Sequence, residues 1–320
     1  MKKLLLFLLL LTSCVSQNPF KSLKTKNDFT QYMIANGETQ WYSFTNLVKP
    51  SEAFKNDTTF LKVIDKSMDT CIVRCNIDGD KYDDFLVYTG SENYLKPYLL
   101  SSKYKKTFVL FGYRLVEPCF PIVEKQNKKS RVVSLRKKML YRDFIKNDKE
   151  YSFYQDTIVR DTLDFWKGQI IEKTEKVNKV EKINLIEFSH SVGMGGIHYS
   201  MNFFENGVVK VLNQEPDFLY QAKISKKEYQ KFCSILNTLN FKNLEANFDA
   251  GITDSGSKSL EIHYGKNKVK QIRDGTHSGT LGLLLLYEEI EELDKKIKWE
   301  LVQNMSEEKM LEYWDSPIMK

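Results

Sequence analysis

The sequence predicts an α+β protein made of two units, and three observations lead to this fold class. Residues 58–172 are rich in β-branched and aromatic residues with short polar breaks, which predicts a β-rich N-terminal domain over residues 28–172. Residues 183–303 alternate strand-like runs with two segments of helical apolar spacing, which predicts a C-terminal antiparallel sheet packed with two helices. Residues 173–182 between them are charged and poor in apolar side chains, as is typical of a linker.

Three runs of the first unit predict strands, at residues 58–64, 107–115 and 151–159. Farther along, residues 162–165 alternate polar with apolar side chains, and Gly168 is expected to turn the chain. The residues expected in the core of this region are Leu163, Phe165, Ile170 and Ile171.

The second unit begins with a predicted strand at residues 183–188, followed by a predicted hairpin of residues 199–204 and 208–212. Asn206-Gly207 between these two runs favours a primed turn. Ser225 and Glu228 form a capping box that begins a helix. The apolar face of this helix is expected to contain Tyr229, Phe232, Cys233, Leu236 and Leu239.

A second strand pair is predicted at residues 259–264 and 268–272, with a turn at residues 265–267. Ser278 is the candidate cap of a long last helix. The residues of that helix expected to face inward are Leu283, Leu286, Tyr287, Ile290, Leu293 and Ile297. Residues 304–320 are expected to form a tail.

The order of these segments resembles an uncharacterised α+β domain family of bacterial envelope proteins, over about residues 182–301. The resemblance is carried by Leu185-Ile186-Glu187-Phe188, the hairpin, the helix start at residues 224–228 and the segment 249–273. It implies a fold but no activity. Many members carry a C-x-G-x-C-P motif in the first loop. This sequence has Ser189-His190-Ser191-Val192-Gly193-Met194-Gly195-Gly196 there, so no role of those cysteines carries over.

The first residues predict export from the cytoplasm. Met1-Lys2-Lys3 precedes an apolar run at residues 4–11, which has the length of a signal-peptide core and is too short to span a bilayer. The next residues, Leu11-Thr12-Ser13-Cys14, resemble the lipobox of bacterial lipoproteins. The resemblance implies that residues 1–13 are removed and that acyl chains such as palmitate anchor Cys14 to a membrane. Residues 14–27 then read as a lipidated tether, and the alternative is an ordinary secretory signal with soluble secretion.

The residues after Cys14 suggest where the anchor lies. No acidic residue follows Cys14 before Asp28. By resemblance to known sorting signals, this favours the outer membrane, with the protein facing the periplasm. The other cysteines, Cys71, Cys75, Cys119 and Cys233, show no metal-binding spacing and are expected to be free thiols.

Charge is distributed unevenly along the chain. Residues 15–180 carry 29 basic and 21 acidic residues, whereas residues 181–320 carry 17 basic and 21 acidic residues. Such asymmetry is typical of two separate units. A nucleic-acid partner is not expected, because no binding motif is present and the protein is predicted to be exported. An envelope protein or a glycan is the expected partner.

One loop predicts a calcium site. Residues 76–84 lie between two apolar strands, and residues 59–90 resemble a single FG-GAP-like calcium-loop unit. The resemblance implies oxygen ligands from Asn76, Asp78, Asp80 and Asp84 and from the Tyr82 carbonyl. Two residues depart from the pattern, Asn76 at the first position and Lys81 where glycine is usual. The alternative is a polar hairpin turn with solvated carboxylates.

A second candidate region is the glycine loop between two histidines. His190 and His198 flank Gly193, Gly195 and Gly196, and an aspartate such as Asp254 or Asp274 would complete a metal site or an acid–base pair. The alternative is that these histidines are ordinary surface or core residues. The loop is not a phosphate-binding motif, and no nucleophile motif such as G-x-S-x-G is present.

Together these patterns favour a non-catalytic binding or structural module, anchored in the envelope and facing the periplasm. The first alternative is a Ca²⁺-stabilised glycan-binding or adhesion protein built on residues 76–84. The second is a hydrolase that uses the histidine-flanked loop. Enzyme activity is therefore not the favoured expectation.

Overall fold

A computed structural model describes most of the chain. The described residues are 20–35, 46–64, 69–91, 94–110, 119–126, 129–146, 149–172, 180–191, 198–214, 217–248, 256–275 and 279–304. They contain two four-stranded sheets, one eight-stranded sheet and five α-helices, so the predicted mixed α+β class is confirmed in broad terms. The chain divides into two compact units, with the main boundary between Ile170 and Ile171. None of the helices in these residues combines the length and apolar character needed to cross a membrane.

The first sheet of unit 1 is an antiparallel meander with one helix packed on it. Its strands, in spatial order, are β1 (Ile72–Cys75), β2 (Asp84–Ser91), β3 (Tyr94–Ser101) and β4 (Lys106–Val109). Phe29 and Met33 of α2 (Lys26–Ala35) are buried against Val87 and Tyr98 of the sheet. Phe20 and Leu23 belong to the same buried cluster, so the end of the predicted tether is part of the core.

Two one-turn helices precede this sheet, α3 (Pro50–Ala53) and α4 (Thr58–Leu61). The predicted strand at residues 58–64 is therefore wrong. Asp57 explains the difference, because its carboxylate accepts hydrogen bonds from the backbone N–H of Thr59 at 3.0 Å and of Phe60 at 3.2 Å. This cap begins a helical turn despite the β-branched residues that follow.

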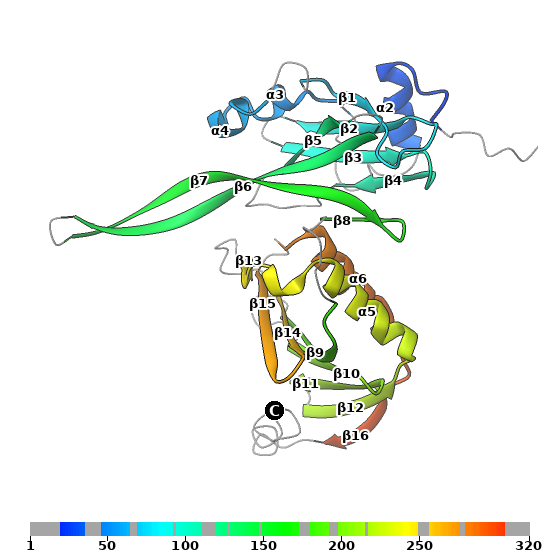
Figure 1. Ribbon diagram of the computed structural model, residues 1–320, viewed down its shortest axis with the longest axis vertical. Helices are drawn as coiled ribbons and strands as arrows, with labels where there is room; N and C mark the ends of the chain where they lie inside the picture. The colour runs from blue at the N-terminus through cyan, green and yellow to red at the C-terminus, as the bar shows by residue number, and fades with distance from the viewer. Residues whose placement is uncertain are drawn as a thin grey trace, which may run out of the picture. The chain divides into compact units, whose positions relative to one another are not determined.

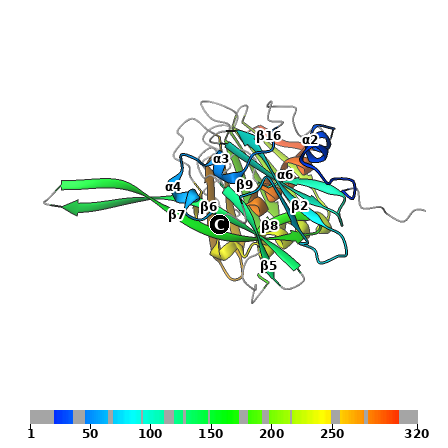
Figure 2. The same ribbon diagram turned by 90° about the horizontal axis from the view of Figure 1, so that it is seen from above.

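The second four-stranded sheet is built on a long ribbon. Its strands, in spatial order, are β5 (Cys119–Gln126), β6 (Lys129–Lys146), β7 (Lys149–Trp166) and β8 (Gln169–Glu172). The strand predicted at residues 151–159 is part of β7. Residues 137–146 of β6 pair only with β7, and this two-stranded part extends away from the rest of unit 1 (Figures 1 and 2).

Two of the four core residues predicted near Gly168 are buried. Leu163 and Ile171 are buried, as predicted, whereas Phe165 and Ile170 are half-buried. Phe165 still packs, because its ring contacts Tyr104 and Phe108. Of the strand predicted at residues 107–115, the part up to Val109 belongs to β4, and residues 111–115 lie outside the described residues.

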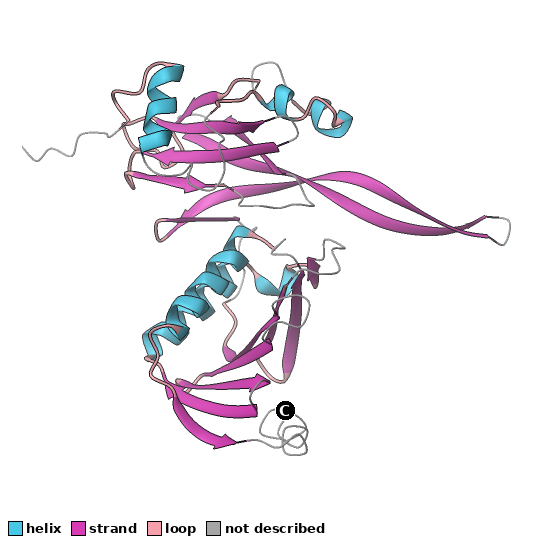
Figure 3. Ribbon diagram, turned by 180° about the vertical axis from the view of Figure 1, so that it is seen from behind, coloured by secondary structure: helices cyan, strands magenta, loops and turns pink. Residues whose placement is uncertain are grey.

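Unit 2 is one eight-stranded sheet with two long helices on one face (Figure 3). The strand order is β13-β15-β14-β9-β10-β11-β12-β16, and all neighbours are antiparallel except β13 and β15. The strands are β9 (Ile183–Ser191), β10 (His198–Phe204), β11 (Val208–Gln214), β12 (Asp217–Lys223), β13 (Asn247–Phe248), β14 (Ser257–Tyr264), β15 (Lys268–Gly275) and β16 (Glu300–Asn304). The helices are α5 (Lys226–Thr238) and α6 (Leu281–Asp294), with a short 3-10 turn, η1 (Phe241–Asn243).

Aromatic contacts identify the side of the sheet that the helices cover, here called the helix face. Phe203 of β10 contacts Phe232 of α5, with ring centroids 5.3 Å apart. Phe188 of β9 contacts Tyr287 of α6 at 5.7 Å. Because side chains alternate along a strand, the neighbours of Phe188 and Phe203 in sequence lie on the opposite face.

Short sequence motifs predicted most of the turns and helix starts of unit 2. The capping box of Ser225 and Glu228 is confirmed. The hairpin is confirmed, but its turn is not a primed two-residue turn. Only Gly207 has a positive φ, of 83°, so residues 205–207 form a three-residue loop with glycine in the left-handed position. The cap of α6 is Thr280 rather than Ser278, since its side chain accepts from the backbone N–H of Leu283.

Candidate functional site

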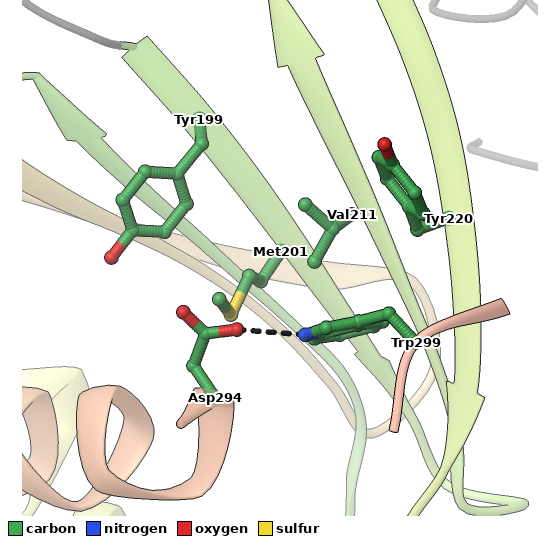
Figure 4. Close-up of a pocket in the computed structure, with 6 residues that line it drawn as sticks. All are labelled: Tyr199, Met201, Val211, Tyr220, Asp294 and Trp299. Atoms are coloured by element: carbon green, nitrogen blue, oxygen red, sulfur yellow. Dashed lines mark hydrogen bonds between the residues drawn. The ribbon is translucent and has the colours of Figure 1, made fainter. Parts of the chain in front are cut away.

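A pocket of about 250 Å³ lies on the helix face of unit 2 (Figure 4). Its floor is a row of register partners on three neighbouring strands, Met201 of β10, Val211 of β11 and Tyr220 of β12. Its walls are Tyr199, Asp294 and Trp299. We call these six residues the aromatic pocket, because three of them present aromatic rings to one space.

A hydrogen bond fixes two of the walls. Asp294 is the last residue of α6, and its Oδ1 accepts from the indole Nε1 of Trp299 at 2.9 Å. This bond holds Trp299 beside the floor of the pocket, just before β16 begins (Figure 4). The carboxylate itself lies between Tyr199 and Trp299, so charge and aromatic surface face the same space.

Burial and nearby carboxylates shift the pKa of two pocket residues, Asp294 and Tyr199. Burial raises the pKa of the Asp294 carboxyl, and the nearby charge of Glu291 raises it further, while Trp299 and Lys295 oppose the shift. Burial, together with the charges of Glu291 and Asp294, also raises the pKa of Tyr199 to about 12. The phenol of Tyr199 therefore stays protonated at neutral pH and is a poor general base there.

A line of polar side chains continues from the pocket along the helix face. His190 Nδ1 lies 3.4 Å from the Tyr199 hydroxyl and 3.9 Å from Glu291 Oε1. The same Glu291 oxygen lies 2.6 Å from Nζ of Lys258, which is buried over the ring of Tyr287. One predicted site residue, His190, is thus adjacent to the pocket.

The other residues of the predicted glycine loop are not brought together by the described structure. Gly193, Gly195, Gly196 and Asp254 lie outside the described residues. The backbone of His198 pairs with Ser191, one step beyond the pair of Tyr199 and His190. Asp274 is fully buried and accepts a hydrogen bond from the backbone N–H of Gly279 at 2.9 Å.

The predicted calcium loop connects β1 to β2. Its side-chain oxygens accept hydrogen bonds from backbone N–H groups of the same loop. One side-chain oxygen each of Asn76, Asp78 and Asp80 accepts from the backbone N–H of Gly79 at 2.7 Å, Asp80 at 3.0 Å and Tyr82 at 2.7 Å, respectively. The second oxygens of Asp78 and Asp80 face the hydroxyls of Ser101 and Ser102, each at 3.4 Å. The left-handed residue of the loop is Gly79, with φ 76°, so the lysine at position 81 does not prevent a tight turn.

Asp84 anchors the same loop to the sheet. Its side chain is fully buried, and its oxygens accept from the backbone N–H groups of Ser102 at 2.8 Å and Ile77 at 2.9 Å. Burial raises the pKa of the Asp84 carboxyl, although these donors partly offset the shift. Nearby, burial also raises the pKa of Cys75, which is a free thiol, as are Cys71 and Cys233. Cys14 and the side chain of Cys119 lie outside the described residues.

Sequence reasoning missed the aromatic pocket. Its residues come from three strands, the end of a helix and the loop after it, and β12 and β16 were not predicted at all. No local motif marks Tyr220, Asp294 or Trp299, because only the strand register and the path of α6 bring them together.

Comparison with known protein families finds one similarity, which lies in unit 2. A search of curated proteins and a search of solved structures each found no match. A family model for a domain of unknown function (DUF6438) matches residues 198–294, which run from β10 to the end of α6 and include all pocket residues except Trp299. Residues 198–294 of this chain are therefore similar to DUF6438, a family that has no assigned function.

Proposed function

We propose that this protein is a non-catalytic binding module of the cell envelope, and that the aromatic pocket binds a small ligand with an organic ammonium group. The observation that carries the proposal is the lining of the pocket. Three aromatic rings and one carboxylate surround a single cavity, and none of its six lining residues is cationic.

The chemistry of these side chains suits a cation. The faces of tryptophan and tyrosine rings attract a positive charge by about 0.5–2 kcal/mol each, and quaternary ammonium groups are bound in such aromatic cages. The Asp294 carboxylate adds a charge-assisted contact, and Glu291 strengthens the negative potential around it. The volume lies just below the roughly 300–1,000 Å³ of typical ligand sites, so the pocket suits a head group rather than a large molecule.

The same residues support binding rather than catalysis. The six lining side chains include no thiol, amine or aliphatic hydroxyl, and one oxygen of the single carboxylate, Asp294, accepts a hydrogen bond from Trp299. The Tyr199 phenol is protonated at neutral pH, because its pKa is raised to about 12. Turnover of an envelope substrate that declines in His190→Ala would instead support the hydrolase alternative.

The proposed location follows from the lipobox. Cleavage after residue 13 and acylation of Cys14 would hold the protein on the outer membrane, facing the periplasm. Exposed amines of envelope glycans or of neighbouring proteins would be the ligands available there, and nucleic acid is not proposed as a partner.

The test compares a cation with its neutral isostere. Residues 15–320, which include every described residue, are titrated by calorimetry with choline and with 3,3-dimethylbutan-1-ol. We expect choline to bind and the alcohol to bind at least about tenfold more weakly, as the loss of a charged contact implies. Asp294→Asn should weaken choline binding to a similar degree, while the exposed control Asp164→Asn should not. Equal affinity for the two probes, or no binding of choline, contradicts the proposal.

A calcium-stabilised adhesion or glycan-binding protein is the second candidate function. The observation in its favour is that Asp78, Asp80 and Asp84 all reach the turn at Ser101 and Ser102 from one loop. Such hard oxygen donors suit Ca²⁺. Thermal unfolding in EDTA and in millimolar Ca²⁺ tests it. A rise in Tm that disappears in Asp80→Ala supports a calcium site, and an unchanged Tm indicates a polar turn.

A further inference from the structure

A second cluster of chemistry-bearing side chains lies on the face of the unit 2 sheet opposite the helices. Glu187 of β9 is the direct register partner of Glu261 of β14, and His263 lies two residues farther along β14. Their neighbours Ile186, Phe188 and Ile262 are fully buried on the helix face. The alternation of side chains therefore directs Glu187, Glu261 and His263 to the other side of the sheet.

The three side chains converge on one point. His263 Nε2 lies 2.8 Å from Glu187 Oε1 and 3.0 Å from Glu261 Oε1, and one ligand atom from each residue lies within 4.8 Å of the other two. A neutral imidazole nitrogen carries at most one hydrogen, so it cannot fully satisfy both carboxylates. Two like charges directly opposite one another on neighbouring strands are also destabilising. A cation between them would remove both problems.

A neighbouring residue orients the cluster of Glu187, Glu261 and His263, and the cluster remains accessible to solvent. Glu261 Oε2 accepts a hydrogen bond from Gln271 Nε2 at 2.7 Å, and Gln271 is the register partner of Glu261 on β15. The side chains of His263, Glu187 and Glu261 are 21%, 16% and 34% exposed, respectively. Water can therefore reach the cluster and complete the coordination of an ion.

We propose that Glu187, Glu261 and His263 bind one Zn²⁺ ion, with water as the remaining ligand. One imidazole and two carboxylates match the donors that zinc accepts, and a nitrogen ligand argues against Ca²⁺ or Mg²⁺. Zinc bonds to these atoms are about 2.0–2.2 Å long, so tetrahedral ligand atoms lie roughly 3.3–3.6 Å apart. The two distances from His263 Nε2 to the carboxylates, 2.8 and 3.0 Å, would therefore have to lengthen by about 0.3–0.8 Å. The ion would join β9 to β14 in the middle of the sheet.

This site is independent of the aromatic pocket, which lies on the other face of the sheet and has none of the three ligands among its lining residues. Zinc binding would therefore persist in Asp294→Asn, and ammonium binding does not require it. The failure of either proposal leaves the other intact.

The experiment measures zinc binding directly. Residues 15–320 are stripped with a chelator, dialysed and titrated with Zn²⁺ by calorimetry, with elemental analysis of the recovered protein. We expect one zinc per chain and a rise in Tm on saturation. His263→Gln should weaken binding by at least about tenfold, and Gln271→Ala by roughly tenfold through the lost orientation of Glu261. The matched control is His190→Gln, which changes a histidine on the helix face and should bind zinc like the parent protein.

Folding of the variants is checked by circular dichroism. If His263→Gln does not fold, zinc binding is measured in Glu261→Gln instead. This variant keeps the shape and the polarity of the side chain while removing one anionic ligand, so it should also bind zinc more weakly. Substoichiometric zinc in the parent protein overturns the proposal. So does unchanged affinity in both His263→Gln and Glu261→Gln, or loss of zinc in Asp294→Asn.

Discussion

Glu172 caps α6 across 110 residues of sequence, because its Oε2 accepts a hydrogen bond from the backbone N–H of Gly282 at 3.0 Å. The other oxygen, Oε1, accepts from the backbone N–H of Leu281 at 2.6 Å. The first N–H groups of a helix have no partner within it, and their partial positive charge favours an anion. Glu172 is only 7% exposed, so these two donors act on a largely buried carboxylate.

Replacement of this cap should destabilise unit 2. In Glu172→Gln the amide has one acceptor oxygen for two N–H donors and carries no charge. We expect the free energy of unfolding to fall by about 1–2 kcal/mol, the usual range for a lost cap or a lost charged hydrogen bond. Urea denaturation measures it. The exposed control Glu300→Gln should stay within about 0.5 kcal/mol of the parent protein, and equal stability of the two variants would contradict the role of Glu172.

Gly282 also permits the contact between α6 and the end of α5. A Cβ at this position would overlap Cδ2 of Leu239 and lie 2.9 Å from its Cδ1 and Cγ, and Leu239 is fully buried. Alanine would normally gain about 1 kcal/mol in a helix, but overpacking a core costs roughly 1–3 kcal/mol. We expect Gly282→Ala to lower the free energy of unfolding. A double-mutant cycle with Leu239→Ala checks the cause, because the penalty should largely vanish in that background. A penalty that persists there would place the strain elsewhere.

Ammonium binding to the aromatic pocket should depend on the protonation of Asp294. The groups that act on this carboxyl are Trp299, Glu291, Lys295 and Tyr199, and the net effect, led by burial, is a raised pKa. A cation prefers the ionised form, so affinity is full above the raised pKa and falls as the pH drops through it. The fall should begin at a higher pH than for an ordinary aspartate. Calorimetry with choline over a pH series measures this. Asp294→Asn should flatten the profile, and a flat profile in the parent protein would exclude Asp294 as the anionic contact.

Features set by residues close together in the sequence could be predicted, whereas features set by residues far apart in the sequence could not. Ser225 and Glu228 mark the start of α5 within four residues, so the sequence alone reveals it. Asp57 also acts locally, but β-branched residues at 58 and 59 concealed its cap. The pair Glu187–Glu261 depends on a strand register that joins residues 74 positions apart. Trp299 meets Tyr220 through the path of α6 and the pairing of β16 with β12. Such sites need the tertiary structure, because no local pattern encodes them.

The predicted lipid anchor on Cys14 determines the compartment in which the protein would bind a ligand. If Cys14 is acylated, the full-length protein should fractionate with membranes, because several acyl chains on one residue give durable attachment where a single chain does not. Cys14→Ser should release it into the soluble periplasmic fraction, or leave it uncleaved with its signal peptide attached. Cys71→Ser is the matched control, since Cys71 is a free thiol within unit 1 and should not affect fractionation. Mass spectrometry of the N-terminal peptide identifies the modification directly. An unmodified peptide that begins after residue 13 would indicate an ordinary secretory signal, and the envelope anchor would then have to be abandoned.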